Sequence, residues 1–344
     1  MSATQVITAT TAPKVQHVGQ ATWRETRPTE PIPQFLIDEA KVETRQSFDA
    51  KRHLRYEPPS KIYTMKEIGL QGQGISPVAV TAPFQLFTEE AIKQMRAAIF
   101  SQPVLDNCLY MSEFVKSTLR GMGSARAPFT CDAWNSPEVL AKVSEVAGIE
   151  LVPALDYEIT AINISVNDQT VLNFNAPKTD EDEYPGFAWH RDSYPFVCVT
   201  MLSNCVGMTG GETALKTAWG EIMKVRGPAM GTAVVMQGRY IEHQALKAIG
   251  GRERISMVTS FRAKSPHVKD ECVLTGVRPI SNLSELYGQY TQYRLEVLEE
   301  RIRDRLKKEQ WRELAKRSFD IADVKTFLTE QKEFIESMME ELIE

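Results

Sequence analysis

Between residues 156 and 262 the chain carries short runs rich in β-branched and apolar residues, each bounded by Gly, Pro, Asn or Asp. These runs are YEITAINISVN, FVCVTMLSN, ETALKTA, MGTAVVMQG and RISMVTSFR. Such runs are typical of β-strands, and no stretch of about 10–15 residues with helical periodicity separates them. The pattern therefore predicts antiparallel strands in a jelly roll or barrel rather than alternating βαβ units.

Helices are expected on both sides of the strand-rich region, because apolar residues there recur at helical spacing. The expected helical segments are residues 33–48, 87–100, 137–147, 281–315 and a stretch that starts after Asp320. Thr88 and Asp320 are suitable N-caps, since their side-chain oxygens accept hydrogen bonds from the first free N–H groups of a helix. The predicted fold class is a mainly β core with flanking α-helices, α+β overall.

The chain is expected to divide into three parts. Residues 1–60 contain a third of the 18 prolines, which predicts a partly irregular N-terminal arm over residues 1–79. Residues 80–265 form the β-rich domain with its preceding helices, and residues 266–344 form a C-terminal helical extension. The charged stretch EERIRDRLKKEQWRELAKR in this extension mixes both signs. It indicates a solvated face, and a homodimer through these C-terminal helices is the alternative.

Composition excludes several classes of protein. The chain has 40 basic and 45 acidic residues, a net charge of −5, which argues against nucleic-acid binding because that needs basic surface. Five cysteines without a CxxC pair indicate neither a disulfide framework nor structural zinc. No apolar run approaches the ~18 residues of a membrane span, and no secretory signal is visible. We expect a cytoplasmic protein with no membrane partner.

The segment FAWHRDSYPF contains the first residues that indicate chemistry. His190 and Asp192 are two residues apart, so on a strand both side chains point to the same face and can bind one metal ion. His243 lies in the same β-rich region, directly after a strong strand. Two histidines and one carboxylate form a facial triad that leaves open positions, as in non-haem Fe(II) oxygenases. The other histidines are interpreted as surface residues: His17, His53 and His267.

A candidate anion site follows the second histidine. Arg254 and Ser256 open the run RISMVTSFR and share a face of a strand by alternation. A guanidinium binds a carboxylate through two parallel hydrogen bonds, and a hydroxyl adds a third, which suits the distal carboxylate of a dicarboxylate co-substrate. Arg252 has the same strand parity and is the alternative anchor, although it lies in the GGRER turn.

The order His-x-Asp, His and Arg-x-Ser, threaded through short strands, resembles the Fe(II)/2-oxoglutarate-dependent oxygenase superfamily. Further matches are the GGET sequence at 210–213, Gly227-Pro228, and GTAVV at 231–235. These motifs cover roughly residues 185–262. The sequence as a whole is similar to superfamily members from fungal secondary metabolism. The arm and the C-terminal helices are not explained by the resemblance.

The resemblance implies a double-stranded β-helix in which His190, Asp192 and His243 bind Fe(II). It also implies that Arg254 and Ser256 bind 2-oxoglutarate, which is decarboxylated to succinate while O2 is consumed. The expected activity is that of a dioxygenase that oxidises a small molecule by hydroxylation, desaturation, epoxidation or oxidative cyclisation. An amino-acid-derived metabolite is one candidate substrate. Halogenation is excluded, because halogenating relatives replace the carboxylate that Asp192 supplies.

Four residues near the motif are candidates for contact with substrate. They are Phe187, Trp189, Tyr194 and Asn173. Filling of the core is an equally good interpretation of the aromatic residues, and a turn is the commoner role of an asparagine. Two other functions stay open at this point: a cupin-like metal-dependent enzyme that does not use 2-oxoglutarate, and a non-catalytic jelly-roll interaction protein.

Overall fold

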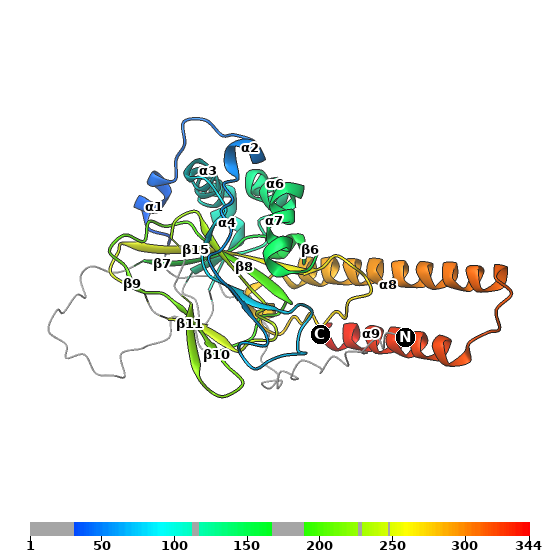
Figure 1. The fold of residues 1–344 in the computed structure, drawn as a ribbon. Coiled ribbons are helices and arrows are strands. Elements are labelled where there is room, and N and C mark those ends of the chain that lie inside the picture. The colour runs from blue at the N-terminus through cyan, green and yellow to red at the C-terminus, as the bar shows by residue number, and fades with distance from the viewer. Residues whose placement is uncertain (1–30, 112–116, 167–188, 226–228, 247) are drawn as a thin grey trace.

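A large antiparallel sheet forms the centre of the molecule (Figure 1). The computed structural model describes residues 31–111, 117–166, 189–225, 229–246 and 248–344. The main path of the sheet, in spatial order, is β1 (Ile62–Thr64), β2 (Val78–Thr81), β12 (Thr232–Met236), β8 (Phe196–Met201), β15 (Glu253–Ala263), β7 (Ala161–Val166), β5 (Ser117–Leu119) and β4 (Leu109–Tyr110). In addition, β3 (Phe84–Gln85) pairs with β12, and β6 (Leu151–Pro153) pairs with β15.

A smaller sheet faces the first one. Its strands are β11 (Ile222–Val225), β10 (Thr213–Lys216) and β13 (His243–Ala245). Two further short strands, β9 (Thr209–Gly210) and β14 (Ala248–Ile249), pair with each other. His190 extends the smaller sheet through a single bridge to His243. From β8 onward the chain passes from the large sheet to β10 and β11 of the smaller one, back to β12, across again to β13 and back to β15. These repeated crossings build a double-stranded β-helix, as predicted.

Helices cover the outer face of the large sheet (Figure 1). The helices that precede the barrel are α1 (Gln34–Glu39), α2 (Ala50–His53), α3 (Glu89–Ile99), α4 (Gln102–Cys108), α5 (Gly123–Arg126), α6 (Pro128–Asn135) and α7 (Pro137–Ala147), and two 3-10 turns lie at Asp156–Glu158 and Arg278–Ile280. Trp134 of α6 is fully buried against the rings of Phe87 and Phe261. A second apolar cluster, which includes Val197, Leu215 and Val234, fills the space between the sheets.

One expected helix is shorter than predicted. Residues 33–48 form a helix only as far as Glu39, and an extended segment follows. The side chain of Gln94, on α3, accepts a hydrogen bond from the backbone N–H of Gln46 and donates one to the carbonyl of Thr44. These two hydrogen bonds pair backbone groups of Thr44 and Gln46 in the extended conformation, so these groups do not need the hydrogen bonds of a helix.

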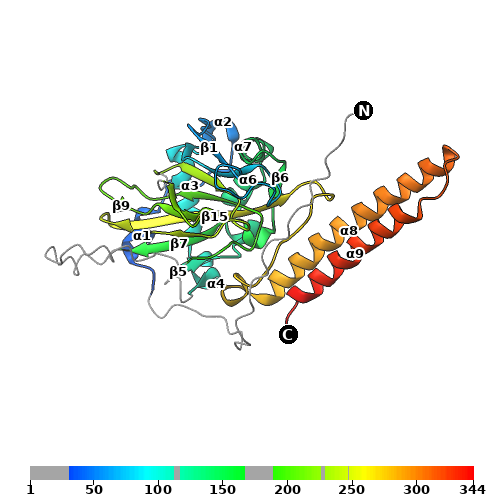
Figure 2. The same cartoon turned by 60° about the horizontal axis from the view of Figure 1, so that its bottom comes forward.

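The C-terminal extension is a hairpin of two long helices, α8 (Leu283–Leu314) and α9 (Ile321–Glu341), that projects from the barrel (Figures 1 and 2). Asp320 caps α9, as expected, by accepting from the N–H of Asp323. The base of the hairpin is held by a buried ion pair, with 3.3 Å between Nη1 of Arg294 and Oδ2 of Asp270. Among the described residues no helix is long and apolar enough to cross a membrane.

The boundaries of the three expected parts stay a prediction. The structure does place part of the expected arm inside the sheet, since β1 and the first residues of β2 precede residue 80. Residues 264–344 pack through their own apolar cluster, which contains Leu274, Tyr290 and Phe334, against the end of the barrel.

Candidate metal centre

Three side chains meet at the edge of the smaller sheet. The ligand atoms of His190, Asp192 and His243 all lie within 4.8 Å of one another. His190 is the bridge partner of His243, and their rings lie with centroids 4.4 Å apart. The sequence analysis predicted His190 and Asp192 on a regular strand. The structure shows an extended segment with a single bridge, in which the backbone N–H of Asp192 donates to the carbonyl of Gly238.

The spacing of these side chains fits a metal ion better than a direct hydrogen bond. Nε2 of His190 lies 3.7 Å from Oδ1 of Asp192, and Nε2 of His243 lies 3.6 Å from Oδ2. Both distances exceed the range of a hydrogen bond. Oδ2 of Asp192 is buried and has no hydrogen-bond partner among the described residues. A buried carboxylate oxygen left unpaired beside two imidazole nitrogens matches the donor set of a divalent transition metal.

The surroundings of His243 set its protonation. Nδ1 lies 2.9 Å from the carbonyl oxygen of Ile241, and a carbonyl only accepts, so Nδ1 carries the proton and donates. Nε2 is then left with its lone pair toward Asp192. Burial lowers the pKa of His243, and the Asp192 carboxylate only partly offsets this effect. The neutral imidazole that metal ligation needs is therefore the favoured form.

Gly238 is a residue of the site that the sequence analysis missed. A Cβ built on Gly238 would lie 1.8 Å from Oδ2 of Asp192, so only glycine leaves room for the carboxylate. Its carbonyl also accepts the Asp192 N–H, so this one residue positions both the backbone and the side chain of the ligand. The only signal in the sequence is a glycine directly after the strand run MGTAVVM, a pattern that equally fits a turn.

Arg254 and Ser256 lie on the inner face of β15. Their neighbours Ile255 and Met257 pack into the cluster beneath the helices, whereas Val258 packs between the sheets. Alternation therefore directs Arg254, Ser256 and Val258 into the barrel. Ser256 pairs with Asn163 of β7 on one side and with Met201 of β8 on the other.

Arg254 has no hydrogen-bond or ion-pair partner in the described part of the chain. Burial lowers the pKa of its guanidinium, only partly offset by Cys205, and Nε lies 3.5 Å from the position a Cβ on Gly211 would take. A desolvated cation without a carboxylate is suited to bind an anion. The alternative anchor, Arg252, instead forms an ion pair with Glu39 and stacks on Phe35 at the surface.

The structure does not bring the expected substrate-contact residues together. The ring of Trp189 lies 4.4 Å from Nζ of Lys216, a residue that follows the inward-facing Leu215 and so points away from the barrel interior. Tyr194 is buried in the cluster at the base of α8. Phe187 and Asn173 lie outside the described residues.

Of the remaining histidines, one departs from the expected surface role. His53 is fully buried, and its Nδ1 accepts a hydrogen bond from the backbone N–H of Asp49. His267 is exposed and pairs with Asp304. His17 lies outside the described residues. Neither His53 nor His267 belongs to the group formed by His190, Asp192 and His243.

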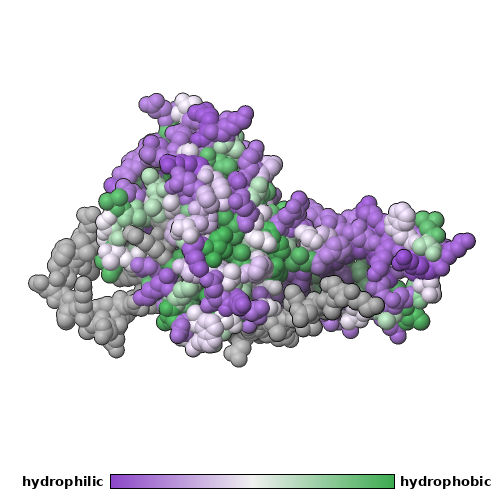
Figure 3. Space-filling view, viewed as in Figure 1, coloured by the Kyte–Doolittle hydropathy of each residue, from purple (hydrophilic) through white to green (hydrophobic). Residues whose placement is uncertain are grey.

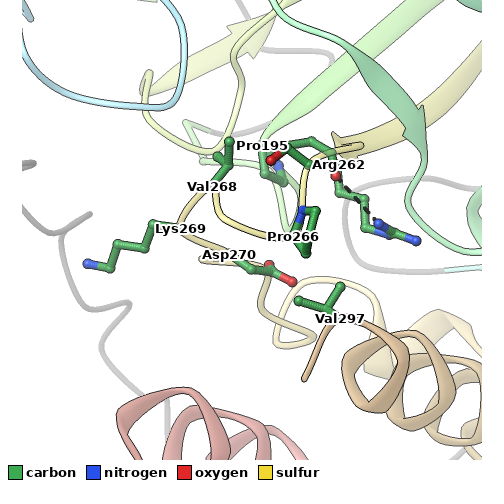
Figure 4. A pocket seen from close by; sticks show the side chains of 9 residues that line it. Pro195, Arg262, Pro266, Val268, Lys269, Asp270 and Val297 are labelled. Atoms are coloured by element: carbon green, nitrogen blue, oxygen red, sulfur yellow. Dashed lines mark hydrogen bonds between the residues drawn. The ribbon is translucent and has the colours of Figure 1, made fainter. Parts of the chain in front are cut away.

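A small pocket lies between the end of β15 and α8, away from the triad (Figure 4). Its lining includes Arg262, Asp270 and Val297. The free volume of about 10 Å³ is close to the smallest cavity that holds one water molecule. This space is therefore a packing gap at the junction of barrel and hairpin, and too small for an organic substrate.

Comparisons with known proteins give a partial structural likeness only. No family model matches the chain, and no curated protein matches its sequence. Among solved structures, it is similar to a 2OG-Fe(II) oxygenase family oxidoreductase from Burkholderia pseudomallei, with 15% identity, a TM-score of 0.31, and coverage of 42% of this chain and 65% of that one.

Two further structures are similar over most of their own length. A prolyl-4-hydroxylase from Pseudomonas putida has 17% identity and a TM-score of 0.33, with 52% of this chain and 88% of that chain covered. AviO1 from Streptomyces viridochromogenes Tue57 has 15% identity and a TM-score of 0.36, with 55% and 91% covered.

Proposed function

We propose that this protein is a non-haem Fe(II)- and 2-oxoglutarate-dependent oxygenase that oxidises a small-molecule substrate. The observation that supports it best is the buried Oδ2 of Asp192, which lies beside two imidazoles and has no hydrogen-bond partner among the described residues. The same barrel directs Arg254 inward, and that residue also lacks a partner in the described part of the chain. Together they offer a metal site and an anion site within one β-helix, which is the donor set that the chemistry requires.

His190, Asp192 and His243 would hold the metal, and Arg254 with Ser256 would hold the distal carboxylate of 2-oxoglutarate. When bound, Fe(II) would supply the redox chemistry that couples decarboxylation of 2-oxoglutarate to oxidation of the substrate. The residues of the chain do the rest. Ile241 fixes the His243 tautomer, and Gly238 leaves room for the carboxylate.

The test is succinate formation from 2-oxoglutarate in the presence of Fe(II), measured for the wild type and for matched arginine variants. We expect Arg254→Ala to raise KM for 2-oxoglutarate by about 10- to 100-fold, because a charge-assisted pair is lost. Arg252→Ala is the control, since Arg252 is bound at the surface by Glu39, and its KM should equal that of the wild type.

The two alternatives have different outcomes. A cupin-like enzyme would bind Fe(II) through the triad but release no succinate, and its Arg254→Ala variant would behave as the wild type. A non-catalytic jelly-roll protein would keep its iron stoichiometry in His190→Ala and Asp192→Ala. Either result would contradict the proposed function.

A further inference from the structure

The hairpin of α8 and α9 is packed in an unusual way, with charged residues inside. Three arginines of α8 stack over phenylalanine rings of α9 and of the loop that precedes it. The pairs are Arg301 over Phe334 at 4.4 Å, Arg305 over Phe327 at 5.5 Å and Arg312 over Phe319 at 5.3 Å. Cation–π stacks of this kind join the two helices in addition to the apolar cluster at the base of the hairpin, which contains Val297 and Phe334. Several large aliphatic side chains of the same helices are exposed and take no part in this packing.

Large aliphatic side chains lie on the outside of the hairpin instead. On α9, Ile321, Leu328 and Ile335 are spaced by seven residues and are 62%, 58% and 41% exposed. On α8, Leu295 and Ile302 are also seven apart and are 52% and 44% exposed. Seven residues correspond to two helical turns, so each set forms one stripe along its helix, as the apolar seam of a coiled coil does.

The two stripes lie on the same side of the hairpin. On α8, Ile302 directly follows Arg301, which faces α9, and on α9, Ile335 directly follows Phe334, which faces α8. Successive side chains of an α-helix are rotated by about 100° about the helix axis. Because the helices are antiparallel, these equal turns direct both aliphatic side chains to one face.

The stripes are also level with one another. Arg294 lies beside Phe334, and Arg305 lies beside Phe327. Leu295 is therefore level with Ile335, and Ile302 with Leu328. We call this surface the aliphatic face, formed by Leu295, Ile302, Leu306, Ile321, Leu328, Ile335 and Met339.

We propose that the aliphatic face binds the same face of a second copy of this chain, so that two hairpins form a four-helix bundle. The face is about 30 Å long and two helices wide, about 20 Å. Two copies would then bury on the order of 1,200 Å², which reaches the lower limit of a specific interface. The regular spacing of seven residues on both helices suits the packing of helices in such a bundle.

The charges around the face favour an identical partner. On the outer edge of α8, Glu299 pairs with Arg303, and on that of α9, Lys332 pairs with Glu336. Both partners of each ion pair belong to the same helix, so two identical edges can meet without net electrostatic repulsion. The hairpin projects away from the barrel in both views (Figures 1 and 2), which leaves room for a second hairpin. Polar residues cover most of the side visible in Figure 3, as expected when a single face is apolar.

The test is the mass of the full chain in solution, by light scattering and sedimentation equilibrium over a range of concentrations. We expect twice the 38.8 kDa of one chain. Ile302→Glu and Leu328→Glu should each return the protein to one chain mass, because each places an uncompensated charge in the aliphatic face. Both positions are exposed in the single chain, so circular dichroism and melting should confirm that the variants are folded.

Leu314→Glu is the matched control. Leu314 is 74% exposed on the same helix, but it lies about 100° round from the aliphatic stripe, so this variant should remain a dimer. A wild type that is monomeric at all concentrations would overturn the proposal, as would Ile302→Glu and Leu328→Glu variants that stay dimeric. Dimer formation only after removal of residues 1–30 would assign the face to that segment instead.

Discussion

At the scale of single residues, Gly238 leaves the space that the carboxylate of Asp192 occupies beside the two histidines. We expect Gly238→Ala to lower the affinity for Mn(II) by at least about 10-fold, since repositioning a ligand through its supporting contacts has effects of that size. The reason is steric, because the added Cβ would occupy the place of Oδ2. Isothermal titration of the metal-free protein measures this affinity without any need for turnover.

The control for this change is Gly288→Ala. Gly288 lies in α8, and a Cβ there would meet nothing within 4 Å, so metal affinity should not change while the helix gains roughly 0.5–1 kcal/mol. Unchanged Mn(II) affinity in Gly238→Ala would show that Asp192 does not bind the metal in the orientation described.

At the scale of elements, a buried ion pair between Arg294 and Asp270 joins the hairpin to the segment that follows β15. Arg294 is fully buried and its partner Asp270 is nearly so. We expect Asp270→Asn to lower the free energy of unfolding by about 3–5 kcal/mol, because it leaves a buried guanidinium without its counter-charge. Urea denaturation measures this loss. Asp304→Asn, which breaks exposed pairs with Lys307 and His267, should have little effect, and equal losses in the two variants would contradict the importance of burial.

The same pair makes the junction sensitive to acid. Burial raises the pKa of Asp270, but the Arg294 charge and the hydrogen bonds from Cys272 together outweigh burial and hold the pKa below its usual range. A carboxyl with a lowered pKa in the folded state stabilises the fold above its unfolded pKa, about 3.9. This contribution is lost as the pH falls through the lowered value. The acid-dependent part of the stability should therefore be smaller in Asp270→Asn than in the wild type.

Elements whose signals are local were predicted well from the sequence. The helix over 137–147 has exactly matching bounds because Ser136 caps it, Pro137 starts it and Gly148 ends it in a left-handed conformation. The sequence also predicted that His190, Asp192 and His243 lie together, since their order along the chain is itself a pattern. The position of Trp189 could not be predicted from the sequence. The face of the sheet on which a side chain lies depends on the pairing register of the strands. The role of Gly238 depends on a contact between residues 46 positions apart, which no local pattern contains.

At the scale of the whole molecule, the candidate metal site and the candidate anion site lie on different sheets of the barrel. The triad lies on the smaller sheet through the bridge of His190 to His243, whereas Arg254 and Ser256 belong to β15 of the large sheet. A ligand held by the metal at one end and by Arg254 at the other would therefore stabilise the packing of one sheet on the other. Ligands that bind only the folded state raise its stability in proportion to the logarithm of their concentration.

We therefore expect 2-oxoglutarate, added to the Mn(II)-loaded protein at about 100 times its Kd, to stabilise the fold by about 2.7 kcal/mol and raise Tm by several degrees. In contrast, 2-oxopentanoate keeps the 2-oxo acid end but lacks the distal carboxylate, so its shift at the same concentration should be much smaller. Arg254→Ala should reduce the 2-oxoglutarate shift to that of 2-oxopentanoate, and Arg252→Ala should leave it unchanged. Equal shifts for the two acids in the wild type would mean that no residue of β15 recognises the distal carboxylate, and the connection between the sheets would then be made by the metal end alone.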